Sequence, residues 1–306
     1  MQAAEFEQAN YLLSVARRFG TQYDVIITAD NESDFGGRGI QYIHFPKFDP
    51  VRPAVDLRWY NRSRRVADLY RRLATRLTGF SMERMRHNLS VVNSEFMGAR
   101  VRALHGVETV TVHPPIAGSF PAMPWERRED GFVCIGRISP EKRFEQIIGI
   151  LATVRGKDLA PHLQIVGTPD SGAYAAFIRT CVDANRSWVT MHENLPRQEL
   201  AQLVSSHRYG IHAMHEEPFG MAVAEMVSAG CIGFAPNNGG SAQILGGDER
   251  LLYSSPQDAA EKIELTIVRP DLQKDLREYL TPRRALFSAQ RFVNQITELV
   301  KTFEPG

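Results

Sequence analysis

The stretch FVCIGRISPEK, residues 132–142, decides the fold class of this 306-residue chain. It begins as a continuous apolar run and ends in a glycine and a cationic turn, a pattern typical of a buried parallel strand that leads into a helix. From residue 131 onwards, similar runs alternate with helical stretches. This alternation predicts an α/β fold with a parallel, doubly wound sheet. The predicted strands are Phe132–Ile138, Leu163–Gly167, Trp188–His192, Tyr209–Met214, Cys231–Ala235 and Leu251–Tyr253.

The rest of the chain has helical periodicity or a less regular alternation. Four prolines and several charges in residues 114–131 indicate a linker between two domains. The predicted helices span residues 141–154, 172–185, 197–206, 219–229, 240–246, 256–267 and 282–303. In the first part we expect helices at 4–18 and 94–105, strands at 23–29, 40–45, 89–93 and 109–113, and an arginine-rich helical region up to about His87.

Length and pattern together predict two domains. We expect a first Rossmann-like domain over residues 1–120 and a second one over residues 121–281. The C-terminal helix, residues 282–306, is expected to pack back towards the first domain.

Composition narrows the classes of function. The 36 basic and 35 acidic residues nearly cancel, which argues against a nucleic-acid-binding protein. Cys134, Cys181 and Cys231 are too few for a disulfide framework and are interpreted as small buried side chains. No apolar run is long enough to span a bilayer, and the N-terminus lacks a secretory signal pattern. We therefore expect a cytoplasmic protein, either free or peripheral at the cytosolic face of a membrane.

The segment EPFGMAVAE, residues 217–225, is the most informative for function. Pro218 fits the first position of an apolar helix, in which the carboxylate of Glu225 needs hydrogen-bond donors such as ribose hydroxyls. Glu217 lies eight residues earlier, about 12 Å along a helix. The helix N-terminus between them would favour a phosphate. The alternative is an ordinary core helix with one capping and one internally paired glutamate.

Two further segments lie where parallel sheets bind ligands, beyond the carboxyl ends of strands. Arg137 and Lys142 could grip a diphosphate there, or could simply be surface charges near a helix start. Gly239 and Gly240 precede a short helix and could let backbone amides approach a phosphate, although a plain turn is the commoner explanation.

Together these segments resemble the family 4 glycosyltransferases, which have the GT-B architecture of two Rossmann-like domains. The resemblance runs from about Tyr23 to Leu299. The residues that carry it are GRISPEK (136–142), QIVG (164–167), EPFGMAVAE (217–225) and Gly239-Gly240.

The resemblance implies roles for individual residues. Arg137 and Lys142 would hold the donor diphosphate and stabilise the leaving nucleotide, and Glu225 would bind the ribose. His44 falls where such enzymes carry a histidine that faces the transferred sugar, although a partly buried histidine at a strand end is the alternative. The expected catalytic residues are Arg137, Lys142, Glu217 and His44. The expected donor-binding residues are Gly136, Met191, Asn194, Phe219, Gly220, Met221, Glu225, Gly239 and Gly240.

Several segments of the first half look most like mannosyltransferases that extend lipid-linked oligosaccharides: YNRSR (60–64), VNSEF (92–96) and VHPP (112–115). The resemblance therefore implies a GDP- or UDP-sugar donor, with GDP-mannose preferred, a glycan or lipid-linked acceptor, and no cofactor. It also implies retention at the anomeric carbon. No Asp-x-Asp pair lies at a strand edge and the histidines lack metal-ligand spacing, so we expect no metal site. Without a readable nucleophile pair, front-face displacement is the simpler route.

The chain also departs from the family pattern. Gln243 stands where an acidic residue commonly follows the paired glycines, and the first domain lacks an initial strand, glycine-rich turn and helix. We therefore expect an incomplete first domain, and a second polypeptide as a partner that supplies the missing half. A non-catalytic nucleotide-sugar-binding module is the alternative, and a related epimerase or phosphorylase is another.

An arginine-rich helical region also suggests a contact surface. It is interpreted either as a face for anionic lipid or a lipid-diphosphate acceptor, or as an ordinary solvated helix face. The arginines are Arg58, Arg62, Arg64, Arg65, Arg71, Arg72, Arg76, Arg84 and Arg86.

Overall fold

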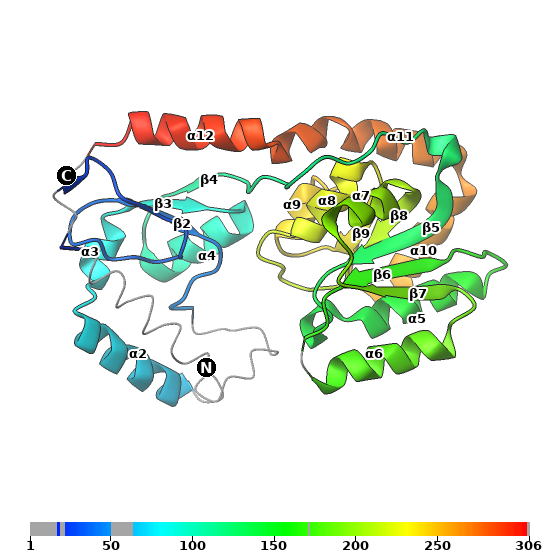
Figure 1. Ribbon diagram of the computed structural model, residues 1–306, viewed down its shortest axis with the longest axis horizontal. Coiled ribbons are helices and arrows are strands. Elements are labelled where there is room, and N and C mark those ends of the chain that lie inside the picture. Colours follow the sequence, from blue (N-terminus) through cyan, green and yellow to red (C-terminus); the bar gives the residue numbers. More distant parts are fainter. Residues whose placement is uncertain (1–16, 19–21, 50–63, 171, 305–306) are drawn as a thin grey trace. The chain divides into compact units, whose positions relative to one another are not determined.

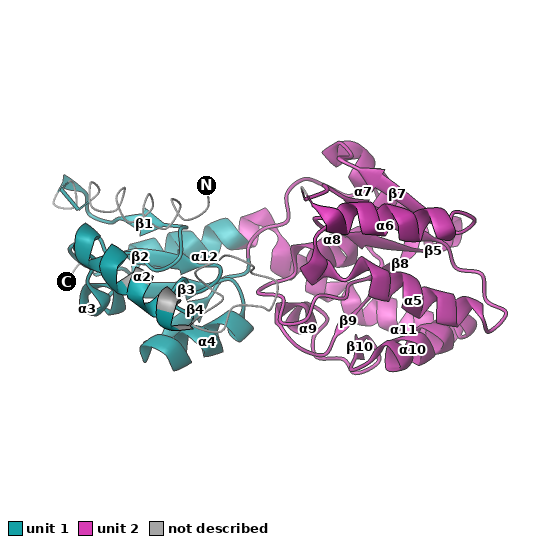
Figure 2. Cartoon of the chain, turned by 90° about the horizontal axis from the view of Figure 1, so that it is seen from below, with its two compact units in different colours: residues 1–113, 292–306 teal, residues 114–291 magenta. Residues whose placement is uncertain are grey.

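The computed structural model describes residues 17–18, 22–49, 64–170 and 172–304. The chain forms two compact units (Figure 2). Unit 1 comprises residues 1–113 and 292–306, and unit 2 comprises residues 114–291.

Unit 2 contains one parallel sheet of six strands in the order β10-β9-β8-β5-β6-β7. The chain runs outward from β5 through β6 to β7, returns through a helix to β8 beside β5, and continues outward through β9 to β10. The doubly wound parallel sheet expected from the sequence is therefore confirmed. The strands are β5 (Glu129–Ile135), β6 (Leu163–Gly167), β7 (Val189–Glu193), β8 (His207–Ile211), β9 (Ile232–Pro236) and β10 (Leu252–Tyr253).

Helices cover both faces of this sheet, with α5 and α6 on one side and α7, α8 and α9 on the other (Figure 1). The reversal of strand order between β5 and β8 makes a topological switch point, where open α/β sheets bind ligands. The helices are α5 (Phe144–Arg155), α6 (Ala173–Ala184), α7 (Arg197–Ser205), α8 (Met221–Ala229), α9 (Gly240–Ile244), α10 (Pro256–Val268) and α11 (Pro270–Leu280), with short 3₁₀ turns η3 (Trp125–Arg127), η4 (Pro140–Lys142) and η5 (Pro282–Phe287).

Some predicted bounds were wrong for identifiable reasons. β5 begins three residues and β8 two residues before the predicted start, because Glu129 and His207 are register partners although polar. The helix predicted from residue 219 begins at Met221, because Gly220 has φ 106°, outside the helical region. A single last helix over 282–303 was also wrong, because Ser288 is extended and separates η5 from α12 (Ala289–Lys301).

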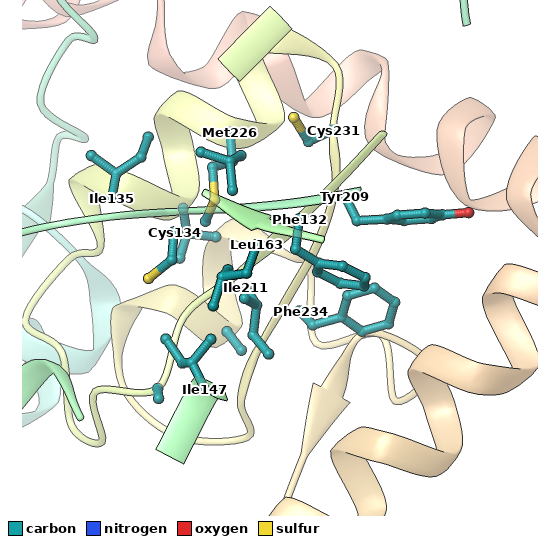
Figure 3. Close-up of a cluster of buried hydrophobic side chains, with 14 of the residues drawn as sticks. Phe132, Cys134, Ile135, Ile147, Leu163, Tyr209, Ile211, Met226, Cys231 and Phe234 are labelled. Carbon is teal, nitrogen blue, oxygen red and sulfur yellow. The ribbon is translucent and has the colours of Figure 1, made fainter. Parts of the chain in front are cut away.

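The core of unit 2 is built on the central strands (Figure 3). The rings of Phe132 on β5 and Tyr209 on β8 stack with their centroids 5.0 Å apart, and Phe234 on β9 lies 6.2 Å from Phe132. All three side chains are at most 1% exposed. Because these strands are held rigidly by packing, the loops at their carboxyl ends have fixed starting points.

Unit 1 contains a four-stranded parallel sheet in the order β1-β2-β3-β4. The strand predicted at 23–29 is confined to two residues, and the helix predicted at 4–18 lies almost wholly outside the described residues. The elements are β1 (Ile27–Thr28), β2 (Ile40–Ile43), α2 (Arg64–Thr78), α3 (Met82–Arg86), β3 (Leu89–Val92), α4 (Glu95–His105), β4 (Thr109–Thr111) and, after unit 2, α12.

The alternation of side chains along these strands gives unit 1 two small cores. Ile40, Tyr42 and Val91 face the apolar side of α12, which contributes Phe292, Ile296, Leu299 and Val300. Ile43 and Val92 join a second cluster with α4. Unit 1 therefore depends on a helix that follows unit 2 in sequence. Among the described residues of both units, no helix combines the length and apolar character that crossing a bilayer requires.

Candidate functional site

The candidate site of unit 2 lies at the switch point, where β5 and β8 end side by side. The chain leaves β5 through Gly136 and Arg137 and enters η4, which ends at Lys142. It leaves β8 directly into His212 and then into the loop that contains Glu217. Cations from one loop and an acid from the other thus start from adjacent strands, as the sequence predicts for a shared site.

Lys142 and Glu217 do meet at this edge. The ammonium nitrogen of Lys142 donates to Oε2 of Glu217 at 2.6 Å, although 75 residues separate them. Nε2 of His212 lies 3.1 Å from the same oxygen and donates to it, because a carboxylate only accepts. The Lys142 nitrogen also lies 3.3 Å from the sulfur of Met214. The result is a partly buried Lys–Glu–His cluster.

The environment keeps the Glu217 carboxylate ionised. Burial alone would raise its pKa, but the hydrogen bond from His212 and the charge of Lys142 outweigh it and lower the pKa to about 2. Both contacts use Oε2. Within the described part of the chain no hydrogen bond to Oε1 is seen, so that oxygen can accept from a ligand hydroxyl.

The glycine pair holds the Glu217 loop in place. The amide of Gly240 donates to the carbonyl of Glu217 at 2.7 Å, so this amide has an internal acceptor. A Cβ on Gly240 would lie 2.5 Å from the carbonyl oxygen of Phe219, and one on Gly239 would lie 2.7 Å from the amide nitrogen of Glu217. Close backbone packing therefore explains both glycines without a ligand.

The same loop positions the start of α8. Gly220, with φ 106°, precedes the first helical residue Met221, whose side chain is 43% exposed. Phe219 is buried against Phe287, with ring centroids 5.9 Å apart. The first-turn amides of a helix have no intrahelical acceptor, so the start of α8 offers N–H groups and a positive dipole end.

Arg137 and Gly136 belong to the same edge but are not part of the cluster. The Arg137 side chain is 69% exposed and makes an ion pair with Glu141, four residues on, at 3.2 Å. A Cβ on Gly136 would make ordinary contact with the stem of Lys142, 3.5 Å away, so the glycine is not required by crowding. The guanidinium of Arg137 is thus left accessible to an anion.

Glu225 has an internal partner that the sequence did not reveal. Its Oε1 accepts from Nη1 of Arg197 at 2.5 Å, and Nη2 of Arg197 donates to the carbonyl of Ala117 at 2.5 Å. Burial raises the pKa of Glu225, and the charge of Arg197 opposes that shift. This arrangement fits the alternative interpretation of an internally paired glutamate better than a carboxylate that is free to bind ribose.

The other expected residues are Met191 and Asn194, at another strand end of unit 2, and His44, which belongs to unit 1. Met191 lies on β7, and Asn194 follows it with φ 56° and donates its amide to the carbonyl of Gly167 at 3.1 Å. β7 is separated from β5 by β6. His44 belongs to unit 1, at the end of β2, where its amide donates to Oδ1 of Asn31 at 2.8 Å.

Sequence reasoning missed His212, Arg197 and Ser241. His212 directly follows β8, and its place after a buried strand could have marked it. Arg197 pairs across 28 residues and left no local signal. The hydroxyl of Ser241 is buried without a hydrogen-bond partner among the described residues, where a Cβ on Gly220 would come within 2.6 Å of it.

Sequence comparison relates the chain to known proteins. A family profile described as "Glycosyl transferases group 1" matches residues 120–281. A Dictyostelium discoideum protein, "GDP-Man:Man(3)GlcNAc(2)-PP-Dol alpha-1,2-mannosyltransferase", is 24% identical over 236 residues, 70% of this chain and 47% of that protein. A protein of the same name from Candida glabrata is 25% identical over 212 residues, 62% of this chain and 39% of that protein. The chain spans less than half the length of these relatives.

Structural comparison agrees with the architecture described above. A sucrose-phosphate synthase from Thermosynechococcus elongatus has a TM-score of 0.70 at 18% identity, over 97% of this chain and 78% of that chain. A likeness at this identity concerns the fold. It shows the GT-B class with two parallel sheets that the sequence predicts.

Proposed function

The chain belongs to the glycosyl transferases of group 1, and on that premise we propose what it transfers and how. It moves a hexose from a nucleotide diphosphate-sugar to a glycan or lipid-linked acceptor. Mannose from GDP-mannose is the preferred donor group, because the sequence relatives are named for GDP-Man and for a PP-Dol-linked oligosaccharide. Reaction occurs with retention and without a metal ion at the donor.

One observation carries this proposal: Lys142 and Glu217 converge at the switch point, with 2.6 Å between ammonium nitrogen and carboxylate oxygen. An ammonium has three N–H donors, and Glu217 takes one of them. A further N–H can reach a phosphate oxygen. Arg137, largely exposed on the same loop after β5, can add a bidentate contact. A held cation, Lys142, and an accessible one, Arg137, on the same loop suit a diphosphate.

These groups account for the chemistry of transfer. The bond between the anomeric carbon and the diphosphate oxygen breaks while an acceptor hydroxyl forms the new bond from the same face. The hydroxyl proton passes to the departing phosphate oxygen. Lys142 and Arg137 stabilise the charge that develops on the diphosphate, which is electrostatic preorganisation. Oε1 of Glu217 accepts from a sugar hydroxyl and orients the hexose.

Mannose transfer from GDP-mannose to a lipid-linked oligosaccharide tests the proposal. Lys142→Ala or Arg137→Ala should lower kcat/KM by roughly 10²–10³-fold, the usual effect of removing one such contact. Lys157→Ala and Arg186→Ala remove surface cations outside the site and should be neutral. Added Mg²⁺ or Mn²⁺ should not change the rate.

Several outcomes would contradict the proposal. Normal turnover by folded Lys142→Ala would remove its assigned role. Binding of GDP-mannose without transfer or hydrolysis would instead support the binding-module alternative, and preference for a UDP-sugar would correct the donor.

A further inference from the structure

A second cluster lies at the opposite edge of the unit 2 sheet. Glu129 is the first residue of β5, His207 is the first residue of β8, and His162 directly precedes β6. These three strands are neighbours, and Glu129 and His207 are register partners. The three side chains therefore start from the amino ends of adjacent strands, whereas Lys142 and Glu217 follow the carboxyl ends.

The ligand atoms of this cluster converge on one point. Oε2 of Glu129 lies 3.1 Å from Nε2 of His162 and 3.9 Å from Nε2 of His207, and the two histidine nitrogens are 3.0 Å apart. Bonds of about 2.0–2.1 Å at tetrahedral angles place zinc ligands about 3.3 Å from one another. The three separations bracket that value.

The backbone carbonyl of Leu203 determines which nitrogen of His207 carries the proton. Nδ1 of His207 lies 2.8 Å from the carbonyl of Leu203, which can only accept, so Nδ1 carries the proton. The His207 side chain is fully buried, and a buried ring is favoured in its uncharged form. Nε2 therefore points a lone pair into the cluster, held by the kind of carbonyl contact that orients metal-bound histidines.

Hydrogen bonds among these three side chains lack one donor. Nε2 of His207 and Oε2 of Glu129 both accept, and the one proton that Nε2 of His162 can carry would serve two acceptors. A cation at the centre would satisfy all three lone pairs. Room for the His162 ring depends on Gly131, because a Cβ there would lie 2.3 Å from Nε2.

We propose that Glu129, His162 and His207 bind one Zn²⁺ ion at the amino edge of the unit 2 sheet. Two imidazoles and one carboxylate suit zinc better than magnesium or calcium, which prefer oxygen ligands. Water fills the fourth position, because the Glu129 and His162 side chains are 57% and 30% exposed. A five-residue strand spans roughly 16 Å, so the ion lies away from the transfer site and joins three strands.

Calorimetric titration of the metal-free, untagged full chain with Zn²⁺ tests the site. One ion should bind per chain, and Co²⁺ in its place should give the absorption of tetrahedral coordination. His162→Ala and Glu129→Gln should weaken binding roughly tenfold or more. His87→Ala removes an exposed histidine of unit 1 and should bind like the wild type. Zn²⁺ should raise the Tm of the wild type and His87→Ala.

Two results would overturn this site. One is the absence of Zn²⁺ binding by the wild-type chain. The other is wild-type affinity for Zn²⁺ in His162→Ala or Glu129→Gln when circular dichroism shows that the variant is folded. Glu129 is exposed, so Glu129→Gln keeps the test valid if His162→Ala does not fold.

Discussion

Among single residues, Glu217 joins the loop after β5 to the loop after β8 at the candidate site. One carboxylate oxygen accepts from both Lys142 and His212, and the backbone carbonyl accepts from Gly240. The sequence predicted Lys142 and Glu217 because each follows a recognisable strand or precedes a recognisable helix. It could not predict their direct contact, or the pairing of Glu225 with Arg197, because those pairs depend on how distant segments fold together.

The acid stability of unit 2 should depend on Glu217. Its folded pKa of about 2 lies below the ordinary value of 4.5, so its contribution is complete above pH 4.5 and is lost as pH falls towards 2. Between pH 5 and pH 3 the wild type should lose about 2 kcal/mol more unfolding free energy than Glu217→Gln. Urea unfolding at both pH values measures the difference. Parallel losses in the two proteins would contradict the assigned pairing.

Among elements, α2 stands out because one of its apolar stripes faces solvent. Leu69, Leu73 and Leu77 recur every four residues and are 59%, 53% and 85% exposed, with Arg72 and Arg76 exposed beside them. Such a basic amphipathic helix fits a membrane surface. Arg84 of the same arginine-rich region does not belong to this surface, because it makes a bidentate ion pair with the buried Asp34. Arg58 and Arg62 lie outside the described residues.

We predict that α2 binds anionic vesicles. Replacing Leu69, Leu73 and Leu77 by serine should abolish co-sedimentation, because the buried apolar area supplies the affinity, and high salt should weaken binding of the wild type. Leu265→Ser alters a comparably exposed leucine of α10 and serves as the control. Equal co-sedimentation of all three proteins would favour the solvated-helix interpretation.

Helices and strands were predicted best where neighbouring residues alone determine their bounds. β6 was predicted to the residue, because its apolar run is bounded at both ends. The start of α8 was missed by two residues, since the loop before it is shaped by backbone packing against Gly239 and Gly240. The zinc cluster gave no motif, because its ligands are 33 and 45 residues apart on three strand starts.

In the molecule as a whole, the two units differ in how their cores are assembled. The core of unit 2 is drawn from residues between Ile116 and Phe287, all within that unit. Unit 1 instead completes a small core with Phe292, Ile296, Leu299, Val300 and Phe303, from α12 and the residues after it. Its stability should therefore be sensitive to the C-terminal helix, whereas that of unit 2 should not.

Substitutions in α12 test this division. Phe292→Ala with Ile296→Ala should destabilise unit 1 by at least roughly 2 kcal/mol, because Phe292 packs on Tyr42 with ring centroids 6.1 Å apart. Val293→Ala changes an exposed neighbour and should have little effect. Hydrogen exchange measures both units separately. Faster exchange in unit 2 rather than unit 1 would contradict the assignment of α12.

The position of α12 also has a consequence for synthesis of the chain. Unit 2 is inserted between two segments of unit 1, so a ribosome releases every residue of unit 2 before it releases the part of α12 that belongs to unit 1, from Phe292 onwards. Domains tend to fold as they emerge. Residues 22–113 would therefore remain without their covering helix until α12 has emerged, and unit 2 would be the earlier of the two units to reach its native state.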